Sequence, residues 1–247
     1  MKIERFDDGI AVCGDATTDE AMKLVIEETN GVPLIIADPP YGNIVDEKWD
    51  RIAEDDSVFA QWMVSWTQKW TAALVPGGAF YIWGGIGIVG FRPFFKFLTA
   101  IEKPGEFELS TLITWSKKRA YGIKWGYLFT REELAYFVKG NIKKPHTFNI
   151  PLLEAKRGYA GYDPRYPAKS EHYRRTNVWT DVTEIMQGKL HPTQKKQRVI
   201  EIPIEVHTKP GDTVVDPFAG APPSRLTGAL GVFGAAVPVI IRLYDVR

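Results

Sequence analysis

The strongest constraint on the fold of this chain is an uninterrupted apolar run from Pro33 to Ala37. A strand that is apolar on both faces must be covered on both faces, which is typical of a parallel sheet with helices on either side. Further strand-like runs occur at 10–12, 79–83, 110–115, 133–138 and 211–216, and segments with helical spacing at 21–25, 58–75 and 91–101 alternate with several of them. This alternation predicts an α/β fold in which βαβ units build a mostly parallel sheet.

Local signals predict where several elements begin and end. Thr17 and Glu20 have the spacing of a capping box, which predicts a helix start at Thr17, and Asn30-Gly31 predicts a left-handed stop after that helix. A further helix is expected from about residue 195 to 207. Pro203 lies inside this segment, where a proline costs about 3 kcal/mol unless the helix kinks.

Composition places the chain among ordinary globular domains. Of its 247 residues 45% are hydrophobic and 25% are charged, and 31 Lys+Arg against 30 Asp+Glu leave a net charge of +1. This balance excludes dominant disorder and uniform electrostatic coating of nucleic acid. The single cysteine, Cys13, excludes an intrachain disulfide and a zinc site built from cysteines, and we expect no metal. Without a signal-peptide pattern or an apolar stretch of the roughly 20 residues that cross a bilayer, the sequence predicts a cytoplasmic protein with no membrane partner.

The segment after the first apolar run, Asp38-Pro39-Pro40-Tyr41, carries the most specific chemistry. Two successive prolines hold the Asp38 carboxylate and the Pro39 carbonyl in a stiff, extended backbone. Two oxygen acceptors beside an aromatic plane suit a planar group that bears an amine. Accepting both hydrogens of the amine localises its lone pair and offsets the positive charge that forms as it attacks an electrophile. A plain proline-rich turn after a buried strand is the alternative interpretation.

Two other predicted strands also end in acidic residues. Gly14-Asp15 follows the first strand, and the segment Asp216-Pro-Phe-Ala-Gly220 begins at the end of the strand at 211–216. In an open parallel sheet, ligands bind outside the carboxyl ends of the strands. We therefore expect these two segments to share a ligand-binding edge with Asp38.

Together these motifs resemble the S-adenosylmethionine-dependent amino-methyltransferases of DNA. The resemblance rests on Asp38-Pro-Pro-Tyr41, on His191-Pro-Thr-Gln-Lys195 and on Lys209-Pro-Gly-Asp-Thr-Val-Val-Asp-Pro-Phe-Ala-Gly220. Because the first motif precedes the other two, the chain resembles the permuted class, in which the catalytic motif precedes the cofactor motif. The resemblance covers about residues 10–220 and implies a Rossmann-like methyltransferase sheet.

The resemblance also implies roles for individual residues. Asp38, Pro39, Pro40 and Tyr41 would be catalytic, holding and stacking a target base that has been flipped out of the duplex. The residues that would bind S-adenosylmethionine are Asp15, Asp38, His191, Thr193, Lys195, Asp216, Phe218 and Gly220. Transfer would be a direct displacement at the methyl carbon, with no covalent enzyme intermediate.

The expected target is the N6 amine of adenine, because an Asp precedes Pro-Pro-Tyr, and the N4 amine of cytosine is the alternative. Methylation at a cytosine ring carbon needs a cysteine nucleophile in its own motif, and Cys13 is not in that setting. The resemblance further implies a DNA partner, a place in a restriction–modification system and, commonly in this class, a homodimer.

A basic, loop-rich segment from Asn141 to Trp179 lies where this class carries its target-recognition region. It contains eight Lys or Arg against three acidic residues, a net charge of +5, with tyrosines interleaved. We expect residues 141–190 to form this insertion, residues 1–140 the catalytic half of the domain and residues 191–247 its cofactor-binding half. The expected DNA contacts are Lys117, Lys118, Arg119, Lys156, Arg157, Arg165, Arg174 and Arg175. A surface insertion without a partner and a solvated hairpin loop at 117–124 are the alternatives.

After Gly220 the sequence departs from the family pattern. Ala221-Pro222-Pro223 replaces the glycine-rich turn, and counting from Asp216 places Val239, not an acidic residue, at the end of the next strand. This departure predicts weakened cofactor binding and puts activity in doubt; a frame-shifted tail over residues 221–247 would explain it. The alternatives to DNA methylation are a catalytically impaired relative that acts as a DNA-binding or partner subunit, and methylation of an amine or amide in RNA or protein.

Overall fold

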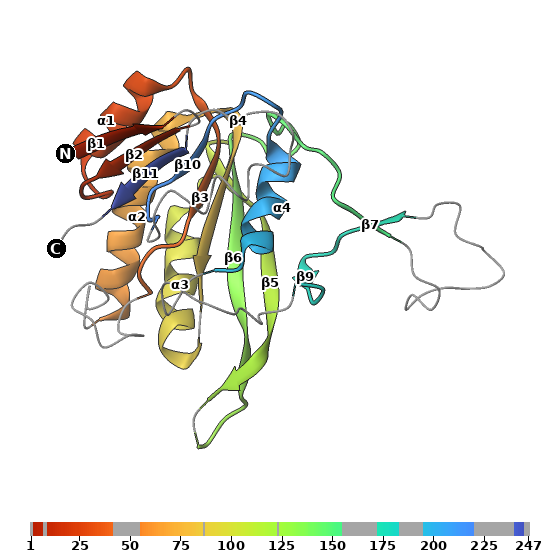
Figure 1. Ribbon diagram of the computed structural model, residues 1–247. Helices are drawn as coiled ribbons and strands as arrows, with labels where there is room; N and C mark the ends of the chain where they lie inside the picture. The colour runs from red at the N-terminus through yellow and green to blue at the C-terminus, as the bar shows by residue number, and fades with distance from the viewer. Residues whose placement is uncertain are drawn as a thin grey trace.

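The computed structural model describes residues 2–6, 9–41, 55–85, 87–122, 124–154, 172–182, 195–219 and 240–244. These segments form a nine-stranded sheet with helices on both faces and a separate pair of short strands (Figure 1). The strands are β1 (Lys2–Phe6), β2 (Gly9–Cys13), β3 (Val32–Ala37), β4 (Leu74–Gly84), β5 (Phe107–Tyr121), β6 (Phe129–Lys139), β7 (Leu152–Glu154), β8 (His172–Arg174), β9 (Val178–Trp179), β10 (Val214–Asp216) and β11 (Ile240–Tyr244). The helices are α1 (Asp19–Glu28), α2 (Asp56–Ala73), α3 (Gly87–Ile101) and α4 (Gln197–His207).

The main sheet has the strand order β1-β2-β11-β10-β3-β4-β6-β5-β9. From β2 to β4 all neighbours are parallel, whereas β6 runs antiparallel to β4 and β5, and β1 runs antiparallel to β2. The predicted α/β class with a mainly parallel sheet is confirmed. The apolar run that predicted it lies within β3, whose six residues are all buried.

Helices cover both faces of this sheet. The helices α1, α2 and α3 pack on one face and α4 packs on the other (Figure 1). Side chains of β3 alternate between the two layers: Ile35 joins the core that contains Trp66, while Leu34 joins the core that contains Val199. Among the described residues, no helix is both long enough and apolar enough to cross a membrane.

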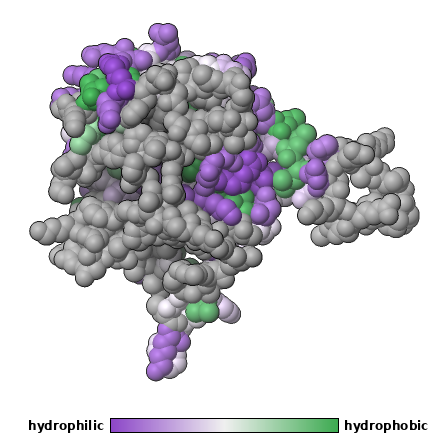
Figure 2. All heavy atoms as spheres, in the orientation of Figure 1, coloured by the Kyte–Doolittle hydropathy of each residue, from purple (hydrophilic) through white to green (hydrophobic). Residues whose placement is uncertain are grey.

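The segment predicted to lack regular periodicity contains only short strands where it is described. β7 and β8 form a two-stranded antiparallel sheet that projects from the body of the molecule, and β9 pairs with the edge of β5 (Figure 1). Hydrophobic surface is visible beside this projection in Figure 2, and Phe148, Ile150 and Leu152 are each more than a third exposed. The projecting segment thus presents apolar as well as charged side chains.

The start of the first helix differs from the prediction. Its N-cap is Thr18 rather than Thr17: the Thr18 hydroxyl accepts a hydrogen bond of 3.3 Å from the Ala21 N–H. Thr17 belongs to the preceding turn, because its N–H and its hydroxyl both donate to Asp15 Oδ1. Gly31 has the predicted positive φ, +100°, but it does not stop the helix, which ends at Glu28 with Thr29 already extended.

The strand that follows Asp216 also differs from the prediction. The prediction that it ends near Val239 is wrong, because β11 begins at Ile240 and ends at Tyr244. Asp245 is therefore the residue that follows this strand in the sequence. β11 lies between β2 and β10 and pairs in parallel with both.

The last described helix, α4, contains a proline without being ended by it. It begins at Gln197, close to the predicted start, and continues past Pro203 to His207. Pro203 is buried, as are Ile202 and Ile204 beside it. Packing against the sheet thus stabilises a segment whose local propensity opposes a continuous helix.

Candidate active site

The carboxyl ends of β3 and β10 lie side by side at one edge of the sheet. The two strands are parallel neighbours, with Leu34 opposite Val214 and Ile35 opposite Val215. Asp38 follows directly after β3, and Phe218 lies in the turn directly after β10, so both residues lie at this edge. The fold therefore brings together the two segments that the sequence analysis singled out, although they lie far apart in the chain.

Asp38 lies just beyond β3, in contact with Tyr41 and Lys195. The Tyr41 hydroxyl donates a hydrogen bond of 2.8 Å to Asp38 Oδ1, and the Lys195 ammonium donates one of 2.7 Å to the Tyr41 hydroxyl. Lys195 Nζ also lies 3.0 Å from Asp38 Oδ1. Pro39 is buried and Pro40 is half-buried, so this corner is anchored in the body of the protein. The Asp38 side chain remains 27% exposed, which leaves it accessible to an incoming group.

Lys195 is held at this corner from several sides. Its Nζ lies 3.0 Å from Glu132 Oε2, 5.1 Å from the centre of the Trp83 ring and 4.8 Å from the centre of the Tyr41 ring. Sequence reasoning assigns Lys195 to the binding of S-adenosylmethionine. The contacts that the structure describes instead tie Lys195 to the catalytic candidates Asp38 and Tyr41.

Glu132 belongs to this cluster, and sequence reasoning missed it. Its side chain is 2% exposed, and each of its carboxylate oxygens pairs with a lysine: Oε1 with Lys117 and Oε2 with Lys195. The predicted strand at 133–138 leaves Glu132 outside the sheet, whereas β6 begins at Phe129 and carries Glu132 into the interior. Lys117, predicted to contact DNA, is therefore paired with a buried carboxylate and is only 14% exposed.

Phe218 forms an aromatic wall at the same edge of the sheet. Its ring meets Trp66 edge-on, with 4.8 Å between the ring centres, and lies 6.3 Å from Trp62. The Asp216 carboxylate accepts a hydrogen bond of 3.0 Å from the Phe218 N–H, which fixes the turn after β10. Phe218 is only half-buried, so its ring combines a packed side with accessible surface. The edge beside Asp38 therefore has an apolar, aromatic side.

Asp15 closes the turn between β2 and α1. Its Oδ1 accepts hydrogen bonds from the Thr17 N–H at 2.9 Å and from the Thr17 hydroxyl at 2.7 Å. Because β11 separates β2 from β10, Asp15 lies two strands away from Asp216 at the same edge. Three carboxylates, those of Asp15, Asp216 and Asp38, thus lie at or just beyond the carboxyl ends of parallel strands.

The arginines predicted to contact DNA differ in exposure. Arg175 pairs with Asp181 at 2.6 Å, and its side chain is only 5% exposed. Its charge is therefore used for an ion pair within the protein. Arg174 is exposed, and its guanidinium lies 5.4 Å from the centre of the Phe148 ring. Of these two, Arg174 is the one presented to solvent. Outside the described residues lie His191, Thr193, Gly220, Lys156, Arg157 and Arg165, as do the side chains of Lys118 and Arg119.

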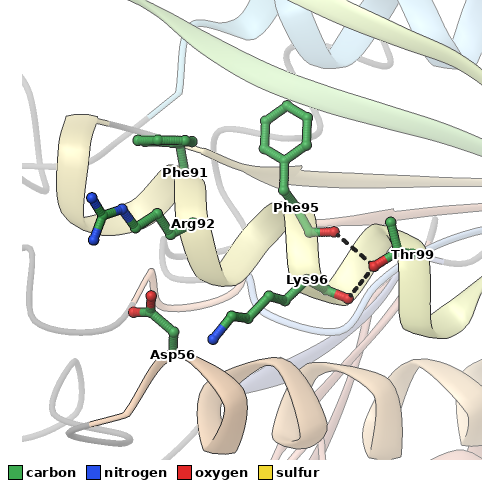
Figure 3. Close-up of a pocket in the computed structure, with 6 residues that line it drawn as sticks. All are labelled: Asp56, Phe91, Arg92, Phe95, Lys96 and Thr99. Atoms are coloured by element: carbon green, nitrogen blue, oxygen red, sulfur yellow. Dashed lines mark hydrogen bonds between the residues drawn. The ribbon is translucent and has the colours of Figure 1, made fainter.

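The hollows on the described surface include the following two. One, of about 440 Å³, has walls that include Tyr136 and Phe148 together with Arg174 and Trp179. The other, of about 550 Å³, is a groove between the start of α2 and α3, and Figure 3 shows the charged ends of Arg92, Lys96 and Asp56 gathered on one side of it. Its lining residues are Asp56, Phe91, Arg92, Phe95, Lys96 and Thr99. None of the predicted site residues that the structure describes lines this groove.

A buried polar cluster joins α4 to β4. His207 Nε2 lies 2.9 Å from the Tyr81 hydroxyl, and its Nδ1 lies 2.9 Å from the carbonyl oxygen of Thr147. Because a carbonyl only accepts, Nδ1 carries the proton and Nε2 accepts from Tyr81. Burial lowers the pKa of His207 to about 4, although the hydrogen bond to Thr147 acts in the opposite direction. His207 is therefore neutral at pH 7.

Comparison with known proteins agrees with this geometry. A family model described as DNA methylase matches residues 32–231, a range that contains both Asp38 and Phe218. The chain is 27% identical over 202 residues to the type II methyltransferase M.HpaI of Haemophilus parainfluenzae, a match that covers 78% of this chain and 59% of the relative. It therefore spans less than two thirds of the length of M.HpaI.

A second relative is similar in sequence, and a solved structure is similar in fold. The chain is 29% identical over 238 residues to the DNA adenine methyltransferase YhdJ of Escherichia coli (strain K12), covering 89% of this chain and 73% of YhdJ. The fold is similar to that of the M1.HpyAVI–SAM complex, with a TM-score of 0.57, 23% identity, and coverage of 96% of this chain and 92% of the other. This likeness is one of fold.

Proposed function

Because the chain belongs to the N6/N4 DNA methylase family, we propose that it transfers a methyl group from S-adenosylmethionine to the N6 amine of adenine in DNA. The observation that carries this proposal is the anchored, partly exposed carboxylate of Asp38 just beyond β3, next to the strand β10 that leads into the turn with Phe218. This arrangement sets an acceptor for an amine beside an aromatic surface against which a cofactor can lie.

The residues at the carboxyl edge fit the proposed cofactor. S-adenosylmethionine supplies a methyl carbon that is activated by the neighbouring positive sulfur. Phe218, supported by Trp66, offers it an accessible apolar face, and Asp15 and Asp216 bring carboxylates to the same edge of the sheet. The structurally similar protein M1.HpyAVI forms a crystalline complex with this cofactor. The proposed contacts remain Asp15, Asp38, His191, Thr193, Lys195, Asp216, Phe218 and Gly220.

The chemistry assigned to Asp38 follows from the weakness of the nucleophile. The lone pair of an exocyclic amine is delocalised into its ring, and acceptors on both hydrogens localise it on nitrogen. We assign these acceptors to Asp38 Oδ2 and the Pro39 carbonyl. As the new C–N bond forms and the C–S bond breaks, the Asp38 carboxylate offsets the positive charge on nitrogen and can take up the departing proton.

Tyr41 is the proposed stacking partner of the target base. The amine of a paired base is unreachable inside the duplex, so the base must be flipped out into a pocket. One face of the Tyr41 ring is covered by the Lys195 ammonium at 4.8 Å. We place the flipped base against the ring of Tyr41. Adenine is preferred to cytosine because an Asp precedes Pro-Pro-Tyr and because the relative YhdJ is named as an adenine methyltransferase.

DNA contact is proposed for residues 141–190. The net charge of +5 between residues 141 and 179, the exposed Arg174 and the projecting β7–β8 pair support it. Arg175 is paired with Asp181, and Lys117 is paired with Glu132. These two basic residues are therefore proposed to contribute to DNA binding indirectly, by fixing the local structure.

A second candidate, a catalytically impaired relative that binds DNA, is favoured by the sequence after Gly220, where Ala221-Pro222-Pro223 replaces a glycine-rich turn. Two observations weigh against it. The family match continues to residue 231, and the end of β11 at Tyr244 puts an acidic residue, Asp245, directly after the strand. This is the position at which the family resemblance calls for an acid to bind the ribose hydroxyls. We therefore propose a functional cofactor-binding half.

Methyl transfer to DNA tests the proposal directly. The protein is incubated with S-adenosylmethionine carrying a labelled methyl group and DNA from a strain without methyltransferases, and the nucleosides are separated and identified. Labelled N6-methyladenine supports the proposal, and N4-methylcytosine would move it to the alternative base. If no label is transferred and the dissociation constant of the cofactor lies far above the micromolar range, the impaired relative is the correct assignment.

A further inference from the structure

The two oxygens of the Asp38 carboxylate are in different situations. Tyr41 and Lys195 both contact Oδ1, at 2.8 and 3.0 Å. Within the part of the chain that the structure describes, no group donates to Oδ2. Because Oδ1 is held from two sides, the carboxylate has a fixed orientation. That orientation determines where Oδ2 is presented to the target amine.

The orientation of Asp38 thus depends on Lys195, whose side chain is intrinsically flexible. The fold restricts it: the side chain is 9% exposed, and its ammonium lies close to the Tyr41 and Trp83 rings. An ammonium that is this poorly solvated needs negative charge around it. Asp38 supplies one carboxylate, and Glu132 supplies the other at 3.0 Å.

Glu132 is suited to fix Lys195 because it is itself immobilised. It lies on β6 in the interior of the sheet, its side chain is 2% exposed, and Lys117 pairs with its second oxygen. The resulting row, Lys117–Glu132–Lys195–Asp38, alternates in sign and balances two positive against two negative charges. It runs from the buried strands β5 and β6 to the accessible carboxylate of Asp38.

Resting on the proposed function, we infer that Glu132 is a positioning residue for methyl transfer: by fixing Lys195 it orients the Asp38 carboxylate toward the target amine. Glu132 does not touch the substrate in this arrangement. Its removal should therefore reduce the rate of the chemical step and leave binding of the cofactor and of DNA largely unchanged.

The test compares two neighbouring glutamates. Glu132→Gln keeps the shape of the side chain and removes its charge, and we expect kcat on unmethylated plasmid DNA to fall by about 10- to 100-fold, as for a misplaced catalytic group. The KM for DNA and the Kd for S-adenosylmethionine should change by less than about threefold. Glu133 is the matched control, since it is equally buried at 2% but its partners are Thr114 and Arg131. Glu133→Gln should keep kcat within about threefold of the wild type.

A double variant separates positioning from general destabilisation. If Glu132 acts through Lys195, Glu132→Gln causes no further loss of kcat in a Lys195→Met background. If Glu132→Gln does not fold, the charge-balanced pair Glu132→Gln with Lys117→Met replaces it. Equal losses of kcat from the two glutamates, or losses from Glu132→Gln and Lys195→Met that multiply, would overturn the inference.

Failure of the proposed function gives a different result. A wild-type protein that transfers no methyl group overturns the proposed function. Whether Glu132 fixes Lys195 is then tested by acetylating the lysines with acetic anhydride and measuring the products by mass spectrometry. Lys195 should be protected in the wild type and in Glu133→Gln but become reactive in Glu132→Gln, with exposed Lys209 as the internal reference. Equal protection of Lys195 in all three proteins would overturn the role of Glu132.

Discussion

The hydroxyl of Tyr41 donates a hydrogen bond of 2.8 Å to the carboxylate of Asp38, three positions earlier in the chain. The two residues are separated by two prolines, whose fixed φ angles hold this short distance in place. Tyr41 consequently has two separable parts, a hydroxyl that fixes Asp38 and a ring that offers a stacking face. Removing only the hydroxyl of Tyr41 and removing its whole ring should therefore have different effects on the kinetics of methyl transfer.

Asp38→Ala should strongly reduce methyl transfer while leaving cofactor binding nearly intact. Loss of the carboxylate removes the acceptor for the amine and the charge that offsets the forming cation, which corresponds to a fall in kcat of about 10²- to 10³-fold. Calorimetric titration with S-adenosylmethionine and a labelled-methyl assay measure the two effects separately. If binding and transfer are lost together, Asp38 does not have the role assigned to it.

Tyr41→Phe and Tyr41→Ala should separate the hydroxyl from the ring. The phenylalanine variant loses the hydrogen bonds to Asp38 and Lys195 but keeps the stacking face, so kcat falls while KM for DNA stays close to that of the wild type. The alanine variant also loses base stacking, worth about 1–3 kcal/mol, so its KM for DNA rises as well. Steady-state kinetics on unmethylated DNA distinguish the two. Identical constants for both variants would show that the ring does not stack on the base.

Phe218→Ala should weaken cofactor binding. The substitution removes the ring that packs edge-on against Trp66 and leaves the carboxyl edge without its aromatic wall. Burial of a large apolar side chain contributes about 1.5–3 kcal/mol, so the Kd for S-adenosylmethionine should rise by about 10- to 100-fold. Phe95→Ala is the control, because Phe95 is an exposed phenylalanine of α3. A similar loss of affinity in both variants would place the cofactor elsewhere.

His207 should make the stability of the protein depend on pH below neutrality. Its pKa is lowered to about 4 in the folded state, whereas the pKa of histidine in an unfolded chain is about 6.5. Above pH 6.5 neither state carries the proton, and His207 contributes no pH dependence. As the pH falls from about 6.5 toward 4, the unfolded chain binds a proton at His207 that the folded protein does not bind. Stability therefore decreases by at most about 1.4 kcal/mol per pH unit.

Urea unfolding at pH 7.5 and pH 5 checks this dependence on pH. The His207→Gln variant cannot protonate at this position, so its unfolding free energy should fall less between the two pH values than that of the wild type. Carboxylates that titrate in the same range are common to both proteins and cancel in the comparison. The same decrease in both proteins would show that His207 does not account for it.

Gly77→Ala should destabilise the fold more than the left-handed backbone alone requires. Gly77 has a φ of +76°, and a Cβ there would lie 2.6 Å from backbone atoms of Lys144 and His146. Gly105 is the matched control, since its φ is +78° but no atom lies within 4 Å of its Cβ position. Gly105→Ala isolates the cost of the conformation, about 1–2 kcal/mol, and Gly77→Ala should lose about 1–3 kcal/mol more. Equal midpoints of thermal unfolding in the two variants would contradict this expectation.

Much of the fold could be predicted because hydrophobic patterning is a local property of the sequence. The apolar run at 33–37 and the segment at 10–12 lie inside β3 and β2. The boundaries of the helices and strands were harder to predict. Pro76-Gly77-Gly78 is typical of a turn, yet it belongs to β4, where the pairing with β3 shifts register between Val32 and Leu34. Only contacts with the neighbouring strand determine such an irregularity.

The candidate site was predictable to the extent that its residues are contiguous. Asp38 and Tyr41 belong to one stiff motif, and their contact follows from local geometry. The contacts of Glu132 with Lys117 and Lys195 depend on the register between β5 and β6 and on where the chain passes before α4. A single sequence contains no local signal for these long-range pairings. The predicted contacts with cofactor and DNA remain predictions.

The position of β11 has a consequence for how the protein acquires its structure during synthesis. Residues 240–244 occupy the gap between β2, which is synthesised long before them, and β10. Until the ribosome has released this segment, the facing edges of both strands lack their partner, and unpaired edges invite wrong pairing with other chains. The half of the sheet proposed to receive the cofactor therefore matures late, whereas β3, β4, β5 and β6 can associate as soon as they emerge.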